Sequence, residues 1–208
     1  MIKRLLELKI AVILILILSI TSCVQNRAPS DKKETVKTQT IVLTGLNPTT
    51  YINQEIGFGI HLPQKWQYDK EGSQEVTFYL DKELGHHYKA VAFSEAENDQ
   101  FPHGMFILVE PTKEIPATEP EQTKHFQFLL ERFESKFSQT QVIKIDGHIA
   151  LRCIFPQTKS GEQLCFYHCT RIFTGEKMFE IIFMVPESFR TQYESILDRS
   201  VETFRVIH

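Results

Sequence analysis

The sequence contains little that would reveal a catalytic activity. It has four cysteines, nine glycines and one tryptophan in 208 residues. It has no Gly-x-Ser-x-Gly motif, which would mark the nucleophile turn of an α/β-hydrolase. Gly57 and Gly59 lack the third glycine and the helix start of a phosphate-binding loop. Residues 95–99 are acidic but lack the ligand spacing and central glycine of a calcium loop. We therefore predict no catalytic residue and no cofactor.

An excess of positive charge is also missing. The formal charge of the chain is -3 at pH 7. Residues 1–22 carry Lys3, Arg4, Lys9 and Glu7, a local +2, so the remainder of the chain stands at -5. Proteins that bind nucleic acid present a basic surface, and this balance argues against nucleic acid as a partner. Apolar residues make up 42% and charged residues 24%, which is ordinary for one globular domain.

The longest unbroken apolar run is too short to cross a membrane as a helix. Residues 10–18 are nine apolar residues, mostly Ile and Leu, whereas a transmembrane helix needs about 20. Residues 1–9 before this run hold three cationic side chains and one acid. A short basic segment followed by a short apolar segment is typical of a signal peptide.

After Ser19, the apolar run is followed by Ile20-Thr21-Ser22-Cys23. This sequence resembles the bacterial lipobox, in which an aliphatic residue and two small residues precede the cysteine that receives lipid. We therefore predict that residues 1–22 are a lipoprotein signal peptide. The alternative is an uncleaved anchor with a cysteine present by chance.

The lipobox resemblance implies a defined chemistry at Cys23. Diacylglycerol is attached to its sulfur, the chain is cleaved before it, and a further acyl chain is often added to the new amine. Two or three chains hold a protein firmly to a membrane, where one does not. The residue after Cys23 is Val24 rather than Asp. In Gram-negative lipoproteins, a residue other than Asp at this position resembles the pattern of proteins released to the outer membrane. The expected location is the cell envelope, lipid-anchored, and the periplasmic side of the outer membrane in a Gram-negative cell.

Residues 23–40 comprise this cysteine and a polar segment rich in Lys, Thr and Gln. Such a composition predicts a disordered tether, and its seventeen residues after Cys23 have an end-to-end distance on the order of 20 to 25 Å. Residues 41–208 then form a single domain. Within it, short runs of Ile, Val, Phe and Tyr predict strands at residues 41–46, 57–62, 75–80, 88–94, 105–110, 141–145, 148–155, 163–173 and 177–185.

The last four predicted strands are joined by short turns at residues 146–147, 158–161 and 174–176. Turns of this length make consecutive strands antiparallel neighbours. Two helices are also predicted. One begins at Thr118, which with Glu121 forms a capping box, and continues with an apolar face; the residues of that face are Phe126, Leu129, Leu130, Phe133 and Phe137. The other spans about 187–201. The predicted fold class is α+β, a twisted antiparallel sheet with helices packed on it.

Several residues carry a resemblance to a known family. Tyr51, the run EIGFGIHLP at residues 55–63 and Trp66 resemble the opening of the PsbP-like superfamily, which includes DcrB-type bacterial lipoproteins and Mog-type Ran-binding proteins. Residues 193–204 resemble its closing helix and last strand, and the Asp146-Gly147 hairpin also fits. The resemblance implies an α/β/α sandwich around an antiparallel sheet. It also implies a protein that binds or assembles other proteins, and no catalytic residue carries over.

Three cysteines remain once Cys23 is set aside. A hairpin turning near residue 159 would place Cys153 opposite Cys165, which makes a disulfide between them possible in an oxidising compartment. Three reduced cysteines packed as small apolar residues are the alternative. A metal site built from Cys153, Cys165, His168 and Cys169 is disfavoured, because His168 points to the opposite sheet face from Cys165. We therefore predict no metal ligands.

The function predicted from the sequence is a membrane-anchored, non-catalytic module that binds or assembles another protein, expected to be one of the cell envelope. Residues 81–88 and 94–104 are the loops predicted to carry recognition. Two alternatives remain open. One is an envelope enzyme, a hydrolase or thiol redox protein, with an unrecognised site that uses Cys169. The other is a lipid or ligand carrier with a large apolar cavity beneath its helices.

Overall fold

The structure is a computed structural model that describes residues 45–84, 88–95, 104–111, 118, 120–124, 127, 139–160 and 163–207. Its elements follow one another along the chain as β1 (Leu46–Asn53), β2 (Phe58–Pro63), β3 (Trp66–Asp69), α2 (Lys70–Leu84), β4 (Lys89–Glu95), β5 (Gly104–Pro111), β6 (Gln139–Ile145), β7 (His148–Ser160), β8 (Gln163–Phe173), β9 (Lys177–Pro186), η1 (Glu187–Phe189), α4 (Arg190–Glu202) and β10 (Arg205–Val206).

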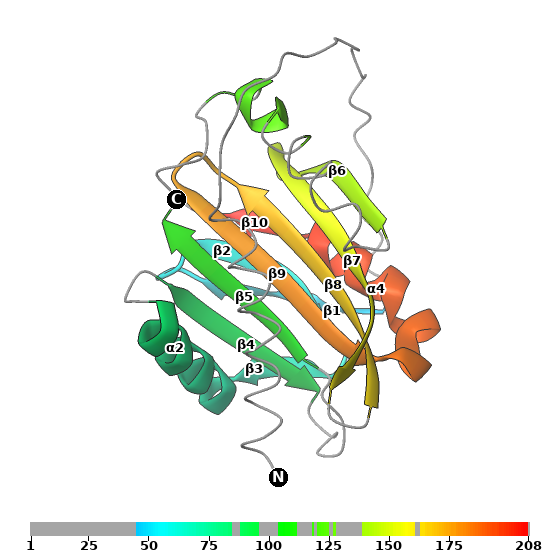
Figure 1. The fold of residues 1–208 in the computed structure, drawn as a ribbon. Coiled ribbons are helices and arrows are strands. Elements are labelled where there is room, and N and C mark those ends of the chain that lie inside the picture. Colours follow the sequence, from blue (N-terminus) through cyan, green and yellow to red (C-terminus); the bar gives the residue numbers. More distant parts are fainter. Residues whose placement is uncertain are drawn as a thin grey trace.

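Seven strands form one antiparallel sheet in the order β3-β4-β5-β9-β8-β7-β6. A second sheet of three strands, in the order β1-β2-β10, packs with α4 on one face of the large sheet (Figure 1). Helix α2 packs on the opposite face, over β4. The chain is therefore an α+β protein of antiparallel sheets and a few helices, as predicted.

The C-terminal half of the large sheet is built from hairpins that the sequence predicts. Asp146 and Gly147 both have positive φ, at 50° and 77°, which is the geometry of a two-residue type I′ turn. Ile145 is therefore paired with His148, and the register of β6 on β7 is regular over its whole length. The next hairpins, β7–β8 and β8–β9, are antiparallel as well.

One predicted strand is wrong, because residues 75–80 lie in helix α2. The helix begins after Asp69, whose side chain accepts a hydrogen bond from the Gly72 N–H at 2.8 Å. Val76 and Leu80 are buried four residues apart, while Phe78 between them is 72% exposed. The apolar residues of this segment therefore follow a helical period, although their alternation is also compatible with a strand.

Other boundaries differ from the prediction as well. The first strand begins at Leu46, five residues later than predicted, and residues 41–44 lie outside the described residues. The short strand β3 was not predicted, and β10 follows the last helix where the family resemblance implied a closing strand. The start of the helix predicted at Thr118 is present: the chain is helical from Pro120, and Thr118 Oγ1 donates a hydrogen bond to Glu121 Oε2 at 2.6 Å. The predicted apolar face of that helix lies outside the described residues. Among the residues that are described, no helix is long and apolar enough to span a membrane.

Candidate functional site

A groove of about 510 Å³ lies between helix α4 and the outer strands of the large sheet. Its lining residues are Gln141 on β6, Arg152 and Ile154 on β7, and Arg190, Thr191, Glu194, Ser195 and Asp198 on α4. The four lining positions from Thr191 to Asp198 share one side of the helix because they are spaced three or four residues apart. The groove therefore lies where one side of α4 faces the edge of the large sheet at β6 and β7.

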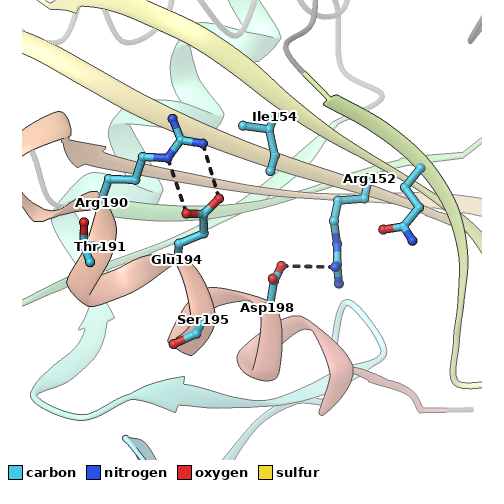
Figure 2. Close-up of a pocket in the computed structure, with 8 residues that line it drawn as sticks. Arg152, Ile154, Arg190, Thr191, Glu194, Ser195 and Asp198 are labelled. Carbon is cyan, nitrogen blue, oxygen red and sulfur yellow. Dashed lines mark hydrogen bonds and ion pairs between the residues drawn. The ribbon is translucent and has the colours of Figure 1, made fainter.

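Two ion pairs stand at opposite ends of the groove, with the side chain of Ile154 between them (Figure 2). At one end, the guanidinium of Arg190 contacts Glu194 at 3.3 Å and Glu187 at 3.5 Å. At the other end, Arg152 Nη1 lies 3.2 Å from Asp198 Oδ1. Arg190, Glu194 and Asp198 are each about one third exposed. The groove therefore offers charges of both signs around a small apolar floor.

Asp198 also ties the helix to the interior of the sheet. Its Oδ1 lies 3.0 Å from Nε2 of His168, a β8 residue whose side chain is fully buried. Burial alone would raise the pKa of the Asp198 carboxyl, but the hydrogen bond from His168 and the positive charge of Arg152 outweigh it and lower the pKa. Asp198 is therefore held as a carboxylate between two partners from different strands.

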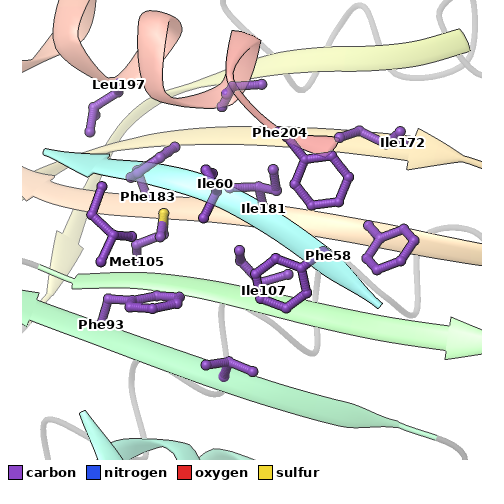
Figure 3. Packing of buried hydrophobic residues seen from close by; sticks show 14 of the residues in the cluster. Phe58, Ile60, Phe93, Met105, Ile107, Ile172, Ile181, Phe183, Leu197 and Phe204 are labelled. Atoms are coloured by element: carbon purple, nitrogen blue, oxygen red, sulfur yellow. The ribbon is translucent and has the colours of Figure 1, made fainter. Parts of the chain in front are cut away.

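The position of α4 is fixed by the apolar core beneath it. Tyr193, Leu197 and Val201 are buried on the inner side of the helix. Leu197 and Phe204 pack over the strands among Phe58, Phe183 and their neighbours (Figure 3). Above this core, the Arg190 guanidinium lies 4.7 Å from the centroid of the Phe166 ring, a cation–π contact. The groove is thus carried by a rigid scaffold.

The groove wall carries hydroxyl and carboxylate groups as well as arginines. Ser195 and Thr191 carry the hydroxyl groups on its wall, and the two carboxylates that line it, Glu194 and Asp198, each contact an arginine. A serine nucleophile needs a base within hydrogen-bond distance, itself oriented by a third group. In the described part of the chain, no group of three or more His, Cys, Asp or Glu side chains could hold a metal ion.

The opposite face of the large sheet holds a buried ion pair. Arg171 Nε donates to Glu180 Oε1 at 2.7 Å, and their side chains are 6% and 2% exposed. Cys169 Sγ donates to the same carboxylate oxygen at 3.3 Å. Burial raises the pKa of the Cys169 thiol well above its usual value and that of Cys153 to about 11. These thiols are therefore protonated at neutral pH, a state unsuited to nucleophilic or redox catalysis.

The predicted pairing of Cys153 with Cys165 rests on a register that the structure does not have. Strands β7 and β8 continue to Ser160 and Gln163, so the hairpin turns later than residue 159. Cys165 therefore lies opposite Thr158, and Cys153 lies opposite Cys169. All three cysteines are buried, and none forms a disulfide within the described residues.

The new facing pair, Cys153 and Cys169, is poorly placed for a disulfide. The Thr174 N–H bonds to the Lys177 carbonyl, so alternate residues of β8 bond to β9 and Cys169 bonds to β7. Cys153 and Cys169 are thus a hydrogen-bonded pair, whose Cβ atoms lie about 5.5 Å apart, against about 3.8 Å in a disulfide. The geometry favours reduced thiols, the alternative that the sequence left open.

The other residues singled out in the sequence are placed as follows. Cys23 lies outside the described residues. Of the two predicted recognition loops, residues 81–84 belong to helix α2, Tyr88 is half-buried, and most of 94–104 lies outside the described part. The charged residues of the groove were not predicted. The i,i+4 spacing of Arg190, Glu194 and Asp198 is the sequence signal that could have found one wall.

Comparison with known proteins gives a family and a fold. The model of the family described as PsbP-like protein matches residues 8–206. No curated protein matches the chain. The chain is similar to the solution structure of cyanobacterial PsbP (CyanoP) from Synechocystis sp. PCC 6803, with a TM-score of 0.51 and 11% identity over 82% of this chain and 98% of that one.

Two further solved structures are similar at lower scores. A protein from Bacteroides thetaiotaomicron has a TM-score of 0.48 and 14% identity, over 76% of this chain and 48% of that one. The Ran-binding protein Mog1p of Saccharomyces cerevisiae has a TM-score of 0.41 and 13% identity, over 77% of this chain and 96% of that one.

Proposed function

The chain belongs to the PsbP-like protein family, and we propose that it is a lipid-anchored bacterial lipoprotein whose folded domain binds or assembles another protein of the cell envelope without catalysing a reaction. Lipid on Cys23 holds the protein at the membrane, residues 24–40 form a tether, and the groove beside α4 receives the partner.

The observation that carries the binding role is the groove with its two ion pairs. The side chains of Arg190 and Glu194 are about one third exposed, so this pair contributes little to folding, with a typical value below about 1 kcal/mol. A partner that supplies its own charged groups can replace the contact between Arg190 and Glu194 at a small cost in free energy. The rigid core under α4 keeps the groove in one shape, which lowers the entropy lost on binding.

The two alternative functions receive less support from the described residues. A thiol redox enzyme needs an accessible, low-pKa cysteine, whereas Cys169 is buried and its pKa is raised. A lipid carrier needs a large apolar cavity, whereas the groove is lined by four charged side chains. A polar protein surface is the occupant that this lining suits best.

The anchoring role is supported by sequence. The order of basic segment, apolar run and Ile20-Thr21-Ser22-Cys23 resembles a lipoprotein precursor. The family match begins at residue 8, two residues before the apolar run, so that the run is part of what the chain shares with its family.

Mass spectrometry of the membrane-bound protein tests the anchor. We expect an N-terminal peptide that begins at an acylated Cys23, and release of the Cys23→Ser variant from the membrane fraction. Cys165→Ser, a buried cysteine in the domain, is the matched control and stays membrane-bound. An intact N-terminus with an unmodified Cys23 thiol would overturn the anchor.

Charge exchange within the groove tests the binding role. The double variant Arg190→Glu with Glu194→Arg keeps an i,i+4 ion pair and the net charge but reverses the field that a partner meets. We expect it to fold and to lose a partner that chemical crosslinking captures from intact envelopes. The matched control exchanges Lys89 and Glu55, an exposed pair 2.9 Å apart and distant from the groove, and keeps the partner. Equal capture by both variants would contradict binding at the groove.

A further inference from the structure

Among the described residues, the two sheets end in four edge strands, and three of them are protected against pairing with another chain. Strand β3 has only four residues and β10 only two. Strand β1 contains Pro48 and a register shift between Leu46 and Thr50. Short length, proline and irregular register are the devices by which proteins block the unpaired backbone of an edge strand.

The fourth edge strand, β6, lacks these devices. Its seven residues contain no proline, and all seven pair with β7 in unbroken register. Its one charged side chain, Lys144, stands next to the hairpin turn, and Val142 at its centre is 37% exposed. In the described part of the chain, no strand pairs with the outer side of β6. A regular and exposed edge of this kind is a template for strand addition.

The hairpin fixes which backbone groups of β6 point outward. Because Ile145 and His148 flank a type I′ turn, they form a hydrogen-bonded pair, and alternate residues of β6 bond to β7 from there. The N–H and C=O groups of Thr140 and Val142 therefore point away from β7. A strand that arrives at this edge would bond to these residues.

We infer that the outer edge of β6 pairs with β6 of a second copy of the chain, antiparallel, about a two-fold axis at Val142. An axis at Val142, the middle residue, pairs all seven residues, and no other position of the axis does. It places exposed Val142 beside its equivalent, apolar on apolar, and sets Lys144 opposite Thr140 of the second copy. The two lysines then lie four residue positions apart, so that a self-complementary contact forms without facing like charges.

This contact uses the backbone of β6 and does not depend on the partner proposed for the groove. The two sites can therefore be tested separately, since the exchange of Arg190 and Glu194 leaves the β6 backbone intact. Pairing joins two seven-stranded sheets into one continuous sheet. A dimer of this kind presents two grooves, one from each copy.

Crosslinking in the membrane tests the geometry. In the full chain carrying Val142→Cys, the two introduced thiols lie directly across the axis, and a short bismaleimide joins them into a covalent dimer. The control is Phe78→Cys, an exposed site on α2 over β4, at the far end of the sheet; it takes up a monofunctional maleimide equally but gives no dimer. Equal labelling of both sites without a dimer from Val142→Cys, or a product containing a different protein, would overturn the inference.

Sedimentation of the detergent-solubilised full chain supplies the second test. Val142→Pro removes an outward N–H without breaking a bond to β7, so we expect a monomer with an unchanged unfolding transition. Val142→Thr keeps both the N–H and the branched side chain, and we expect the dimer of the wild-type chain. A wild-type chain that stays monomeric as its concentration rises, or a dimer that survives Val142→Pro, would show that β6 does not pair with itself. If Val142→Pro fails to fold, the crosslinking result decides.

Discussion

Each face of the large sheet carries an arginine–glutamate ion pair, but the two pairs differ in burial. On the α2 side, Arg171 and Glu180 are almost fully buried at 2.7 Å. On the α4 side, Arg190 and Glu194 are about one third exposed at 3.3 Å. Removing one partner of a buried pair leaves an uncompensated charge, whereas an exposed pair is screened by water. Burial therefore separates a pair that holds the fold from a pair that is available to a partner.

The largest expected effect is on the buried side of this comparison. Arg171→Met leaves the Glu180 carboxylate unpaired, and we expect it to lower the free energy of unfolding by about 3 to 5 kcal/mol. Arg190→Met in the groove should lower it by less than about 1 kcal/mol. Urea unfolding of both variants measures the difference. Adding Glu180→Leu to Arg171→Met should restore most of the loss, and equal losses at the two arginines would break the comparison.

A second effect concerns the thiols beside the buried pair. Burial raises the pKa of Cys153 from 9.0 to about 11, which lowers its thiolate fraction at neutral pH by about 100-fold. We expect a thiol reagent to modify Cys153 and Cys169 at least this much more slowly in the folded protein than in urea. Mass spectrometry of reagent-labelled peptides over time provides the rates. Rapid labelling of Cys169 in the folded state would restore the redox alternative.

The smallest expected effect is the contribution of Asp198, on the groove side of the sheet, to stability in acid. The pKa of Asp198 is lowered on folding from its ordinary 3.8, so as pH falls the unfolded chain takes up the proton first. Stability from this group is therefore complete above pH 3.8 and is lost as pH falls through the lower, folded pKa. We expect Asp198→Asn to reduce the acid dependence of the unfolding free energy below about pH 4. Unfolding curves of both proteins at a series of acidic pH values would show it, and parallel pH profiles would contradict it.

The sequence predicted those parts of the fold that depend on local signals. The hairpin at Asp146 and Gly147 was predictable because both residues tolerate positive φ. Helix α2 was not, because Val76, Phe78 and Leu80 alternate as in a strand, and only packing against the sheet shows that Phe78 faces water. Propensity is a weak guide where the same residues fit both periods.

The candidate site was less predictable than the fold because it joins distant segments. Arg152 and Asp198 are 46 positions apart and meet only because α4 packs over β8 and β9, beside β7. The partner of Cys153 was misassigned since β7 and β8 extend beyond the predicted turn, and the register also shifts between Phe155 and Thr158. Sequence spacing counts residues, but register decides which side chains face each other.

Site-specific photocrosslinking tests the central claim, that a partner binds in the groove beside α4. A photoreactive phenylalanine analogue at Ser195, which lines the groove from α4, should join the anchored protein to one envelope protein. The same analogue at Glu75, exposed on α2 across the sheet, should not, and the Arg190→Glu, Glu194→Arg exchange should abolish the product. The same captured protein from both positions, or a product at Ser195 that survives the exchange, would contradict the account.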